Sequence, residues 1–276
     1  CYNSDWNAPG LHLSEKINNQ ALHNTHLAHG LALNAIRAAS PNKKTEVGLV
    51  HALWIRMPRD PKNKKDVKAA EACFLAKSGR LLEPLYRGVY PAGMWSKGNE
   101  PEITAEEMKL ISAPTDFFGL NVYGGCDVKY NAKEKTGWEE ILFDPEVPVT
   151  SMNWGVTPKS MYWAVKNVYD NYPVKKMYIT ENGAAYIDIV THDGRIHDTD
   201  RINFLKQYLS ELHRAQKDGY KVDGYFLWSL FDNFEWAQGY TQRLGCVYVD
   251  YPTQKRTLKD SAYWYRSVIK NNGIKI

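Results

Sequence analysis

The sequence lacks the features that mark several large classes of protein. Its four cysteines lie far apart and include no C-x-x-C pair, which argues against a zinc knot or a dense disulfide framework. No apolar run approaches the length of a membrane span, and no nucleic-acid-binding motif accompanies the net charge of +4. We therefore expect no membrane partner and no nucleic-acid partner.

The sequence also has no N-x-Ser/Thr site for glycosylation. Widely spaced cysteines are typical of reduced, buried thiols, which favours a cytoplasmic localisation. Residue 1 is Cys rather than Met, and the polar residues 2–7 that follow do not form a signal peptide or a helix start. We therefore expect the chain to begin within a loop, as a piece of a longer protein.

Aromatic residues are abundant by comparison, with 9 Trp and 18 Tyr among 276 residues. The 43% hydrophobic and 24% charged content is that of an ordinary globular protein. Tryptophan and tyrosine rings can fill a core, but they also suit a site whose ligand has flat apolar faces, as sugars do.

Amphipathic segments alternate with short apolar ones along the chain. Apolar residues at helical spacing predict helices at residues 18–39, 66–82, 158–171, 200–218 and 260–270, and a capping-box pattern at Thr104 and Glu107 opens one more. Apolar runs predict strands at residues 47–53, 117–123, 177–180 and 224–229. Because these runs do not alternate apolar with polar residues, we expect parallel strands covered by helices, which is an α/β fold.

Each predicted strand carries a polar or aromatic side chain near its carboxyl end: His51, then Asn121 and Tyr123, then Glu181, then Trp228 and Ser229. A ring of such groups is typical of the catalytic face of a (β/α) barrel. A closed barrel needs eight strands, however, and the chain supplies four. Half a barrel would leave two sheet edges unpaired, which predicts either aggregation or a missing partner.

Glu181 is the best single candidate for a reactive group. It follows the apolar residues 177–179 and precedes Asn182-Gly183, so the pattern places a carboxylate where a buried strand enters a turn. A carboxylate in that position is costly unless it is used or paired. On this stretch alone, Glu181 could equally cap the next helix or pair with an arginine.

A longer motif decides between these alternatives. Residues 228–240 read Trp-Ser-Leu-Phe-Asp-Asn-Phe-Glu-Trp-Ala-Gln-Gly-Tyr, and residues 179–183 read Ile-Thr-Glu-Asn-Gly. Together with matching segments at 8–10, 23–29, 84–91, 116–121 and 248–250, they resemble the family 1 glycoside hydrolases, the β-glucosidase family. The resemblance covers the whole chain, residues 1–276, and only the carboxyl-terminal part of the family's domain.

This resemblance implies a glycosidase-type (β/α)8 barrel of which the chain supplies strands 5 to 8 with their helices. It also implies a retaining mechanism, in which one carboxylate attacks the sugar while a second carboxyl group, about 5–5.5 Å away, protonates the leaving group. Glu181 matches the family nucleophile. Tyr123 matches the tyrosine that donates a hydrogen bond to the nucleophile, and Asn121 matches a nearby strand-end asparagine.

The resemblance assigns a sugar site as well. Trp228 would stack under the sugar ring, Glu235 would accept hydrogen bonds from two hydroxyls, and Trp236 would donate its indole N–H to another. Trp154 matches a platform for the leaving group. These residue types suit a ligand that has C–H faces and a rim of hydroxyls.

The acidic residue at 235 favours an unphosphorylated β-glycoside or oligosaccharide as substrate, because a carboxylate there would repel a phosphate. No cofactor is implied. His23, His26 and His29 could suggest a metal, but the family helix explains them as packing and capping residues.

The family's acid/base Glu lies in an Asn-Glu-Pro motif before the point where this chain begins. Asn99-Glu100-Pro101 spells that triplet, but no apolar strand precedes it, so we reject it. We therefore expect an enzyme that is active only with its amino-terminal half. The alternative is a non-catalytic half-barrel that binds carbohydrate or serves as a scaffold.

Overall fold

A computed structural model describes residues 8–42 and 44–274; the expectation for the first residues concerns 1–7, which lie outside that range. The helices are α1 (Glu15–Ala39), α2 (Lys64–Arg87), α3 (Ala105–Ile111), α4 (Lys159–Asn171), α5 (Thr199–Lys217) and α6 (Asp260–Asn271). All six predicted helices are confirmed. Helix α2 runs further than expected, because it continues through Pro84 in its last turn. The helix ends at Arg87, and Gly88, whose φ is 67°, caps it.

Helix ends are fixed by local side chains, as the sequence predicts at residue 104. The Thr104 hydroxyl accepts from the Glu107 N–H at 3.2 Å, and the Glu107 carboxylate accepts from the Thr104 N–H at 2.7 Å. This capping box satisfies two amide donors at the start of α3. The Asn63 side chain likewise accepts from the Lys65 N–H at 3.0 Å at the start of α2.

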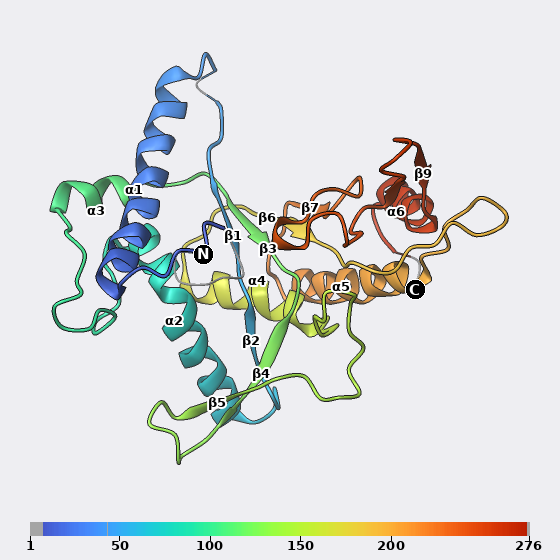
Figure 1. Ribbon diagram of the computed structural model, residues 1–276. Helices are drawn as coiled ribbons and strands as arrows, with labels where there is room; N and C mark the ends of the chain where they lie inside the picture. The colour runs from blue at the N-terminus through green and yellow to red at the C-terminus, as the bar shows by residue number, and fades with distance from the viewer. Residues whose placement is uncertain (1–7, 43, 275–276) are drawn as a thin grey trace.

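The main sheet contains four parallel strands in the order β1-β3-β6-β7. They are β1 (Leu49–Ala52), β3 (Phe118–Asn121), β6 (Met177–Asn182) and β7 (Gly224–Leu227), so all four predicted strands are confirmed. Figure 1 shows β1 and β3 crossing the centre of the molecule, with α4 and α5 beside them. The parallel order brings the carboxyl ends of all four strands to one edge of the sheet.

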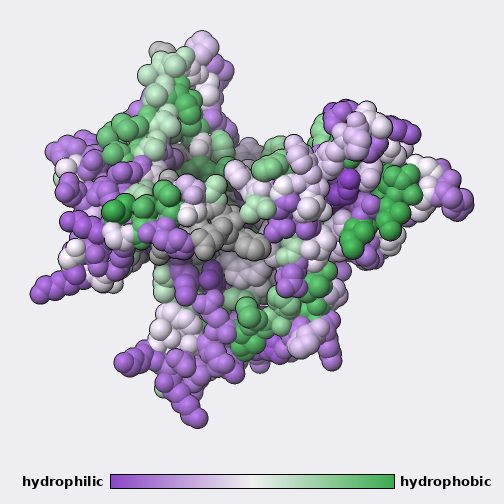
Figure 2. All heavy atoms as spheres, in the orientation of Figure 1, coloured by the Kyte–Doolittle hydropathy of each residue, from purple (hydrophilic) through white to green (hydrophobic). Residues whose placement is uncertain are grey.

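The two faces of this sheet differ in burial. The face covered by helices carries side chains that are 0% exposed, namely Phe118, Leu120, Met177 and Ile179. On the opposite face, Val50 is 51% exposed and Phe226 is 56% exposed. Apolar side chains are also exposed on α1, which projects from the body (Figures 1 and 2) and carries Leu31 and Ile36.

Sequence analysis missed two smaller sheets. One has the order β2-β4-β5, formed by β2 (Ile55–Pro58), β4 (Gly125–Tyr130) and β5 (Trp138–Ile141), and α2 packs against it. The other pairs β8 (Val247–Val249) with β9 (Arg256–Leu258). Strands β2 and β4 begin a few residues after β1 and β3 end, beyond the apolar runs 47–53 and 117–123 that predicted the main strands.

The sequence favours a satisfied strand-end role for His51 over a catalytic one. Its ring lies on the helix-covered face, 6.4 Å from the ring of Phe118, and so apart from the other strand-end side chains. Burial, together with the positive charges of His26 and His29, lowers the pKa of His51 to about 4, and a hydrogen bond to the Leu81 backbone partly opposes this. His51 is therefore a neutral packing residue at neutral pH.

Two of the three histidines of α1, His23 and His26, have structural partners. The Nδ1 atom of His23 lies 3.0 Å from the Tyr90 hydroxyl, and the Nε2 atom of His26 lies 3.1 Å from the Leu81 carbonyl. Over the described ranges, no group of three potential ligand side chains is arranged to hold a metal ion. None of the helices within those ranges is long and apolar enough to cross a membrane.

Candidate active site

Glu181 is the second-to-last residue of β6, which ends at Asn182. The sequence placed this strand end at Thr180 and Glu181 in a loop, so the structure extends the strand by two residues. The ladder is irregular here, because its register shifts between Leu120 and Asn121 and leaves Asn121 opposite Glu181. The β6–β7 ladder shifts between Ile179 and Asn182 as well. Such irregularities redirect a side chain at the end of a strand.

Tyr123 is the direct partner of Glu181. Its hydroxyl donates to the Glu181 Oε2 at 2.7 Å. Burial of the phenol and its hydrogen bond to the Glu181 carboxylate raise the pKa of Tyr123, so the phenol remains a donor. The Tyr208 hydroxyl donates to the Tyr123 carbonyl at 3.0 Å, which fixes the Tyr123 backbone from α5. A neutral phenol held in this way orients one carboxylate oxygen and leaves the other for chemistry.

The two residues after Glu181 explain why Asn and Gly follow it. Asn182 is 0% exposed, donates to the Val122 carbonyl at 2.7 Å and accepts from the Tyr225 hydroxyl at 2.7 Å. It therefore ties β6 to both neighbouring strands. At Gly183, an added Cβ would lie 1.8 Å from the Trp228 carbonyl oxygen, so the close approach of the two segments requires glycine.

Asn121 and Thr180 form a second pair at this strand edge. The Thr180 hydroxyl donates to the Asn121 Oδ1 at 2.6 Å, and Asn121 is 9% exposed. With its carbonyl oxygen used in this way, the amide N–H₂ of Asn121 can serve as a donor toward a ligand.

Trp154 borders Tyr123 on another side. The two rings meet edge to face with 5.4 Å between their centroids. Two hydrogen bonds across a tight turn hold the Trp154 backbone, from the Thr150 N–H to the Trp154 carbonyl at 2.9 Å and from the Trp154 N–H to the Thr150 hydroxyl at 3.3 Å. Asn153 occupies the left-handed position of that turn, with φ at 58°.

Glu235 lies on the loop of residues 228–240, which follows β7. Its side chain is almost enclosed, with the residue 9% exposed, and its Oε2 has no hydrogen-bond partner within the part of the chain that the structure describes. Burial raises the pKa of Glu235, a hydrogen bond from the Trp228 side chain opposes the rise, and the charge of Glu181 adds to it. A buried acceptor without a partner is the kind of group that a hydroxyl-rich ligand would satisfy.

Trp228 and Trp236 flank Glu235 differently. Trp228 is half-buried directly after β7, and its side chain meets the Glu235 carboxylate. Trp236 begins the short helix η1 (Trp236–Gln238), has a φ of 42° and is 74% exposed. The structure thus brings Tyr123, Trp154, Glu181, Trp228 and Glu235 together, and leaves Trp236 at the rim.

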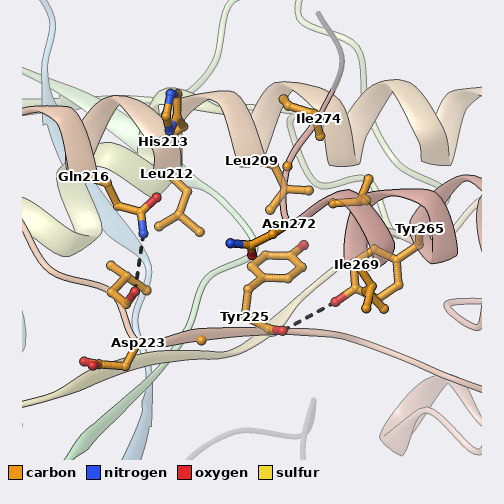
Figure 3. A pocket seen from close by; sticks show the side chains of 14 residues that line it. Leu209, Leu212, His213, Gln216, Asp223, Tyr225, Tyr265, Ile269, Asn272 and Ile274 are labelled. Carbon is orange, nitrogen blue, oxygen red and sulfur yellow. Dashed lines mark hydrogen bonds between the residues drawn. The ribbon is translucent and has the colours of Figure 1, made fainter.

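A cavity of about 450 Å³ lies elsewhere, between α5, β7 and α6 (Figure 3). Its lining includes Leu212, Tyr225, Tyr265 and Ile269, and none of the candidate site residues. Figure 3 shows the Tyr265 hydroxyl reaching the Tyr225 backbone oxygen, at 3.4 Å. The carboxylates are therefore in a separate place, at the carboxyl edge of the sheet.

The rejected triplet at residues 99–101 lies far from the strand ends. The Glu100 carboxylate accepts from the Gly98 N–H at 2.8 Å in an exposed loop. The Asn99 carbonyl accepts from Asn19 on α1 at 2.8 Å. This loop is therefore part of the α1 surface.

Sequence reasoning missed the side chains that hold the 228–240 loop. Asp232 is 4% exposed and pairs with Arg243 and Lys259, whose positions are 11 and 27 residues further along the chain. An acid inside a run of aromatic residues was the only signal available. Its partners could not be found from spacing, because they come from separate elements.

Comparison with known proteins gives consistent matches over the whole chain. A family model described as glycosyl hydrolase family 1 matches residues 1–274. Beta-glucosidase A of Thermotoga maritima is 41% identical over 260 residues, covering 92% of this chain and 57% of that protein. A 6-phospho-beta-galactosidase of Staphylococcus epidermidis is 35% identical over 286 residues, covering 93% and 60%.

Solved structures match equally well. The family 1 β-glucosidase from Thermotoga maritima superposes with a TM-score of 0.84 at 38% identity, covering 98% of this chain and 60% of that one. The β-glucosidase from the same organism in complex with deoxynojirimycin gives a TM-score of 0.83 at 38% identity, covering 98% and 59%. The chain thus spans less than two thirds of the length of these relatives.

Proposed function

Because the chain belongs to glycosyl hydrolase family 1, we propose that it carries the nucleophile and the sugar-binding side of a retaining β-glycosidase. Its four parallel strands are then strands 5 to 8 of a (β/α)8 barrel, and residues 1–276 form the carboxyl-terminal half of one catalytic domain. The remaining strands would pair with the edge strands β1 and β7, and the exposed sheet face that carries Val50 and Phe226 would then line the barrel interior.

One observation carries this proposal: the Tyr123 hydroxyl donates to the Glu181 Oε2 at 2.7 Å, at the carboxyl edge of a parallel sheet. Glu181 attacks the anomeric carbon with its other oxygen, and the bond to the leaving oxygen breaks. That oxygen takes a proton from the acid/base carboxyl group, which we place outside this chain. Water then attacks the anomeric carbon of the glycosyl–Glu181 ester and gives a proton to the acid/base carboxylate. The bond to Glu181 breaks, which releases the sugar and the Glu181 carboxylate.

The remaining candidate residues bind the sugar. Glu235 offers an almost buried acceptor for two hydroxyls, and Trp228, in contact with it, offers a ring face for the C–H side of the sugar. Trp236 at the rim donates its indole N–H. Asn121 donates near the nucleophile, and Trp154 supports the leaving group.

We propose an unphosphorylated β-glycoside or oligosaccharide as the substrate. Relatives named β-glucosidase and relatives named 6-phospho-β-galactosidase both match the chain, so family membership leaves this choice open. The charge of Glu235 favours the first class, because a phosphate near a poorly solvated carboxylate is repelled.

Covalent labelling tests the chemistry. The chain, alone and joined to an amino-terminal half-barrel from a family 1 relative, is incubated with an activated 2-deoxy-2-fluoro-β-glucoside, and its intact mass is measured. We expect one added fluoroglucosyl group, mapped by peptide mass spectrometry to Glu181 and absent in Glu181→Gln. If binding of the glucoside is measurable but no adduct forms even in the joined protein, the chain is a non-catalytic carbohydrate-binding half-barrel instead.

A competition experiment tests the substrate class. The joined protein is given equal concentrations of a 4-nitrophenyl β-glucoside and its 6-phosphate, and the consumption of each is followed by chromatography. We expect the unphosphorylated compound to be consumed first. Preference for the phosphate would contradict the role given to Glu235.

A further inference from the structure

A cluster of buried charged side chains lies beside the candidate site, outside the residues that would touch a sugar. Its members come from separate segments and are Asp188, Asp198, Arg201, Asp232, Arg243 and Lys259. Five of these side chains are at most 1% exposed, and Arg243 is 19% exposed. Three carry positive and three carry negative charge, so the buried cluster is balanced.

Asp232 connects this cluster to the loop of residues 228–240. Its Oδ1 accepts from the Lys259 Nζ at 2.8 Å and from the Gly245 N–H at 3.0 Å. Its Oδ2 accepts from the Arg243 Nη1 at 2.6 Å and from the Val249 N–H at 3.3 Å. Four donors thus fix a carboxylate that lies three residues before Glu235.

The other end of the cluster holds the segment that follows Glu181. Asp188 accepts from Arg201 through both carboxylate oxygens, at 3.0 and 2.9 Å, and from the Lys259 Nζ at 2.6 Å. The Arg201 Nε donates to the Ala184 carbonyl at 3.3 Å, three residues after Glu181. Lys259 is therefore the one described side chain that contacts both Asp188 and Asp232.

Burying the Lys259 ammonium group costs free energy, and a gain in fold stability does not by itself account for its presence there. Burial, with the nearby charge of Arg201, lowers the pKa of Lys259, and the carboxylates of Asp188 and Asp232 act against this. Buried ion pairs are often no more stabilising than apolar residues of the same size. Buried ion pairs do fix the relative position of the segments that carry them, because each charge must meet its partners at hydrogen-bond distance.

We propose that Lys259 is a positioning residue that sets the place of Glu235 relative to Glu181. Asp188 is connected through Arg201 to the backbone after the nucleophile, and Asp232 lies on the loop that carries Glu235. The Lys259 ammonium group bridges the two carboxylates. The inference rests on the proposed function, because it takes Glu235 to be the anchor for sugar hydroxyls. Lys259 acts through Asp232 and needs no contact with the sugar.

A double-mutant cycle tests this role. Binding of deoxynojirimycin, a piperidine with several hydroxyls, is measured by calorimetry for the joined protein and for Lys259→Met, Glu235→Gln and the double variant. Temperatures are kept well below each unfolding midpoint, which circular dichroism determines. Lys255→Met is the matched control, because Lys255 is exposed and lies four residues before Lys259, in the turn between β8 and β9.

We expect Lys259→Met to weaken binding by roughly 10-fold, and Lys255→Met to leave it unchanged. Once Lys259 is replaced, Glu235→Gln should add little further loss, because the anchor is already displaced. Lys259→Arg should recover part of the affinity. A residue that only stabilises the fold would lower the unfolding midpoint and leave the dissociation constant of the folded protein unaltered.

The outcomes separate this inference from the proposed function. If Glu235→Gln weakens binding but Lys259→Met does not, or if the two losses simply multiply, the positioning role is wrong and the sugar site stands. If the parent protein does not bind, or Glu235→Gln changes nothing, the sugar site itself is wrong, and the positioning role falls with it. If Lys259→Met does not fold, Asp188→Asn replaces it in the same cycle, with the same expected coupling.

Discussion

Glu181 and Glu235 belong to the same candidate site but are held in different ways. Glu181 lies in the hydrogen-bonded ladder of a parallel sheet, and Asn182 ties that strand to both neighbours. Glu235 lies on a loop whose position depends on side-chain charges that meet at Asp232. The sheet fixes the reacting carboxylate by backbone geometry, whereas the sugar anchor depends on residues far away in the sequence.

The largest effect that we expect is a loss of stability at acid pH, which acts on the sheet through His51. The pKa of His51 is lowered to about 4 by burial and by the nearby histidines, whereas an unfolded chain has the ordinary value of 6.5. The unfolded state therefore binds this proton first, so stability present above pH 6.5 is lost as the pH falls to about 4. The loss is on the order of 2–3 kcal/mol.

Urea unfolding between pH 7 and pH 4 measures this loss, and His51→Asn should remove most of the pH dependence. His213, which is exposed on α5, gives the control variant His213→Gln. An unchanged pH profile in His51→Asn would show that other groups cause the acid sensitivity.

Gly183 is where the two parts of the site meet, so Gly183→Ala should disturb both. The new Cβ would lie 1.8 Å from the Trp228 carbonyl oxygen, which is backbone and cannot rotate away. We expect the free energy of unfolding to fall by about 1–3 kcal/mol. Urea denaturation measures it, and Gly273→Ala, where the nearest atom is 3.9 Å away, should change it by less than about 0.5 kcal/mol.

Tyr123→Phe should affect only the nucleophile. It removes the hydrogen bond at 2.7 Å to Glu181 and keeps the ring that meets Trp154. A hydrogen bond to a charged group contributes about 1.5–3 kcal/mol, so fluoroglucoside labelling of Glu181 should slow by about 10-fold to 100-fold. Time-resolved mass spectrometry follows the rate. Tyr130→Phe, at the exposed end of β4, should label at the parent rate.

Trp236→Ala should give the smallest effect on the fold. The indole is 74% exposed, so the free energy of unfolding should change by less than about 0.5 kcal/mol. Deoxynojirimycin binding should weaken by about 3-fold to 10-fold if the indole N–H donates to the sugar. Tyr263→Ala replaces another exposed aromatic residue and should not alter binding. If both variants bind deoxynojirimycin with equal affinity, Trp236 does not contact the sugar.

The sequence predicted the elements that depend on local pattern. All six helices and the four strands of the main sheet were found, because apolar periodicity and the capping box at Thr104 are local signals. The short strands β2 and β4 were missed because they begin a few residues after the main strands β1 and β3, and β5 was missed with its partner β4. The face on which His51 packs could not be predicted, because a strand end does not reveal which way a side chain points.

The sequence by itself determined the family and the candidate residues, because contiguous motifs such as 179–183 and 228–240 keep their residue types together. Only the tertiary structure decided how those residues meet. The phenol of Tyr123 reaches Glu181 across 58 positions, and Lys259 reaches Asp188 across 71. Such pairs depend on where the fold brings distant segments together, and they leave no periodic signal in the sequence.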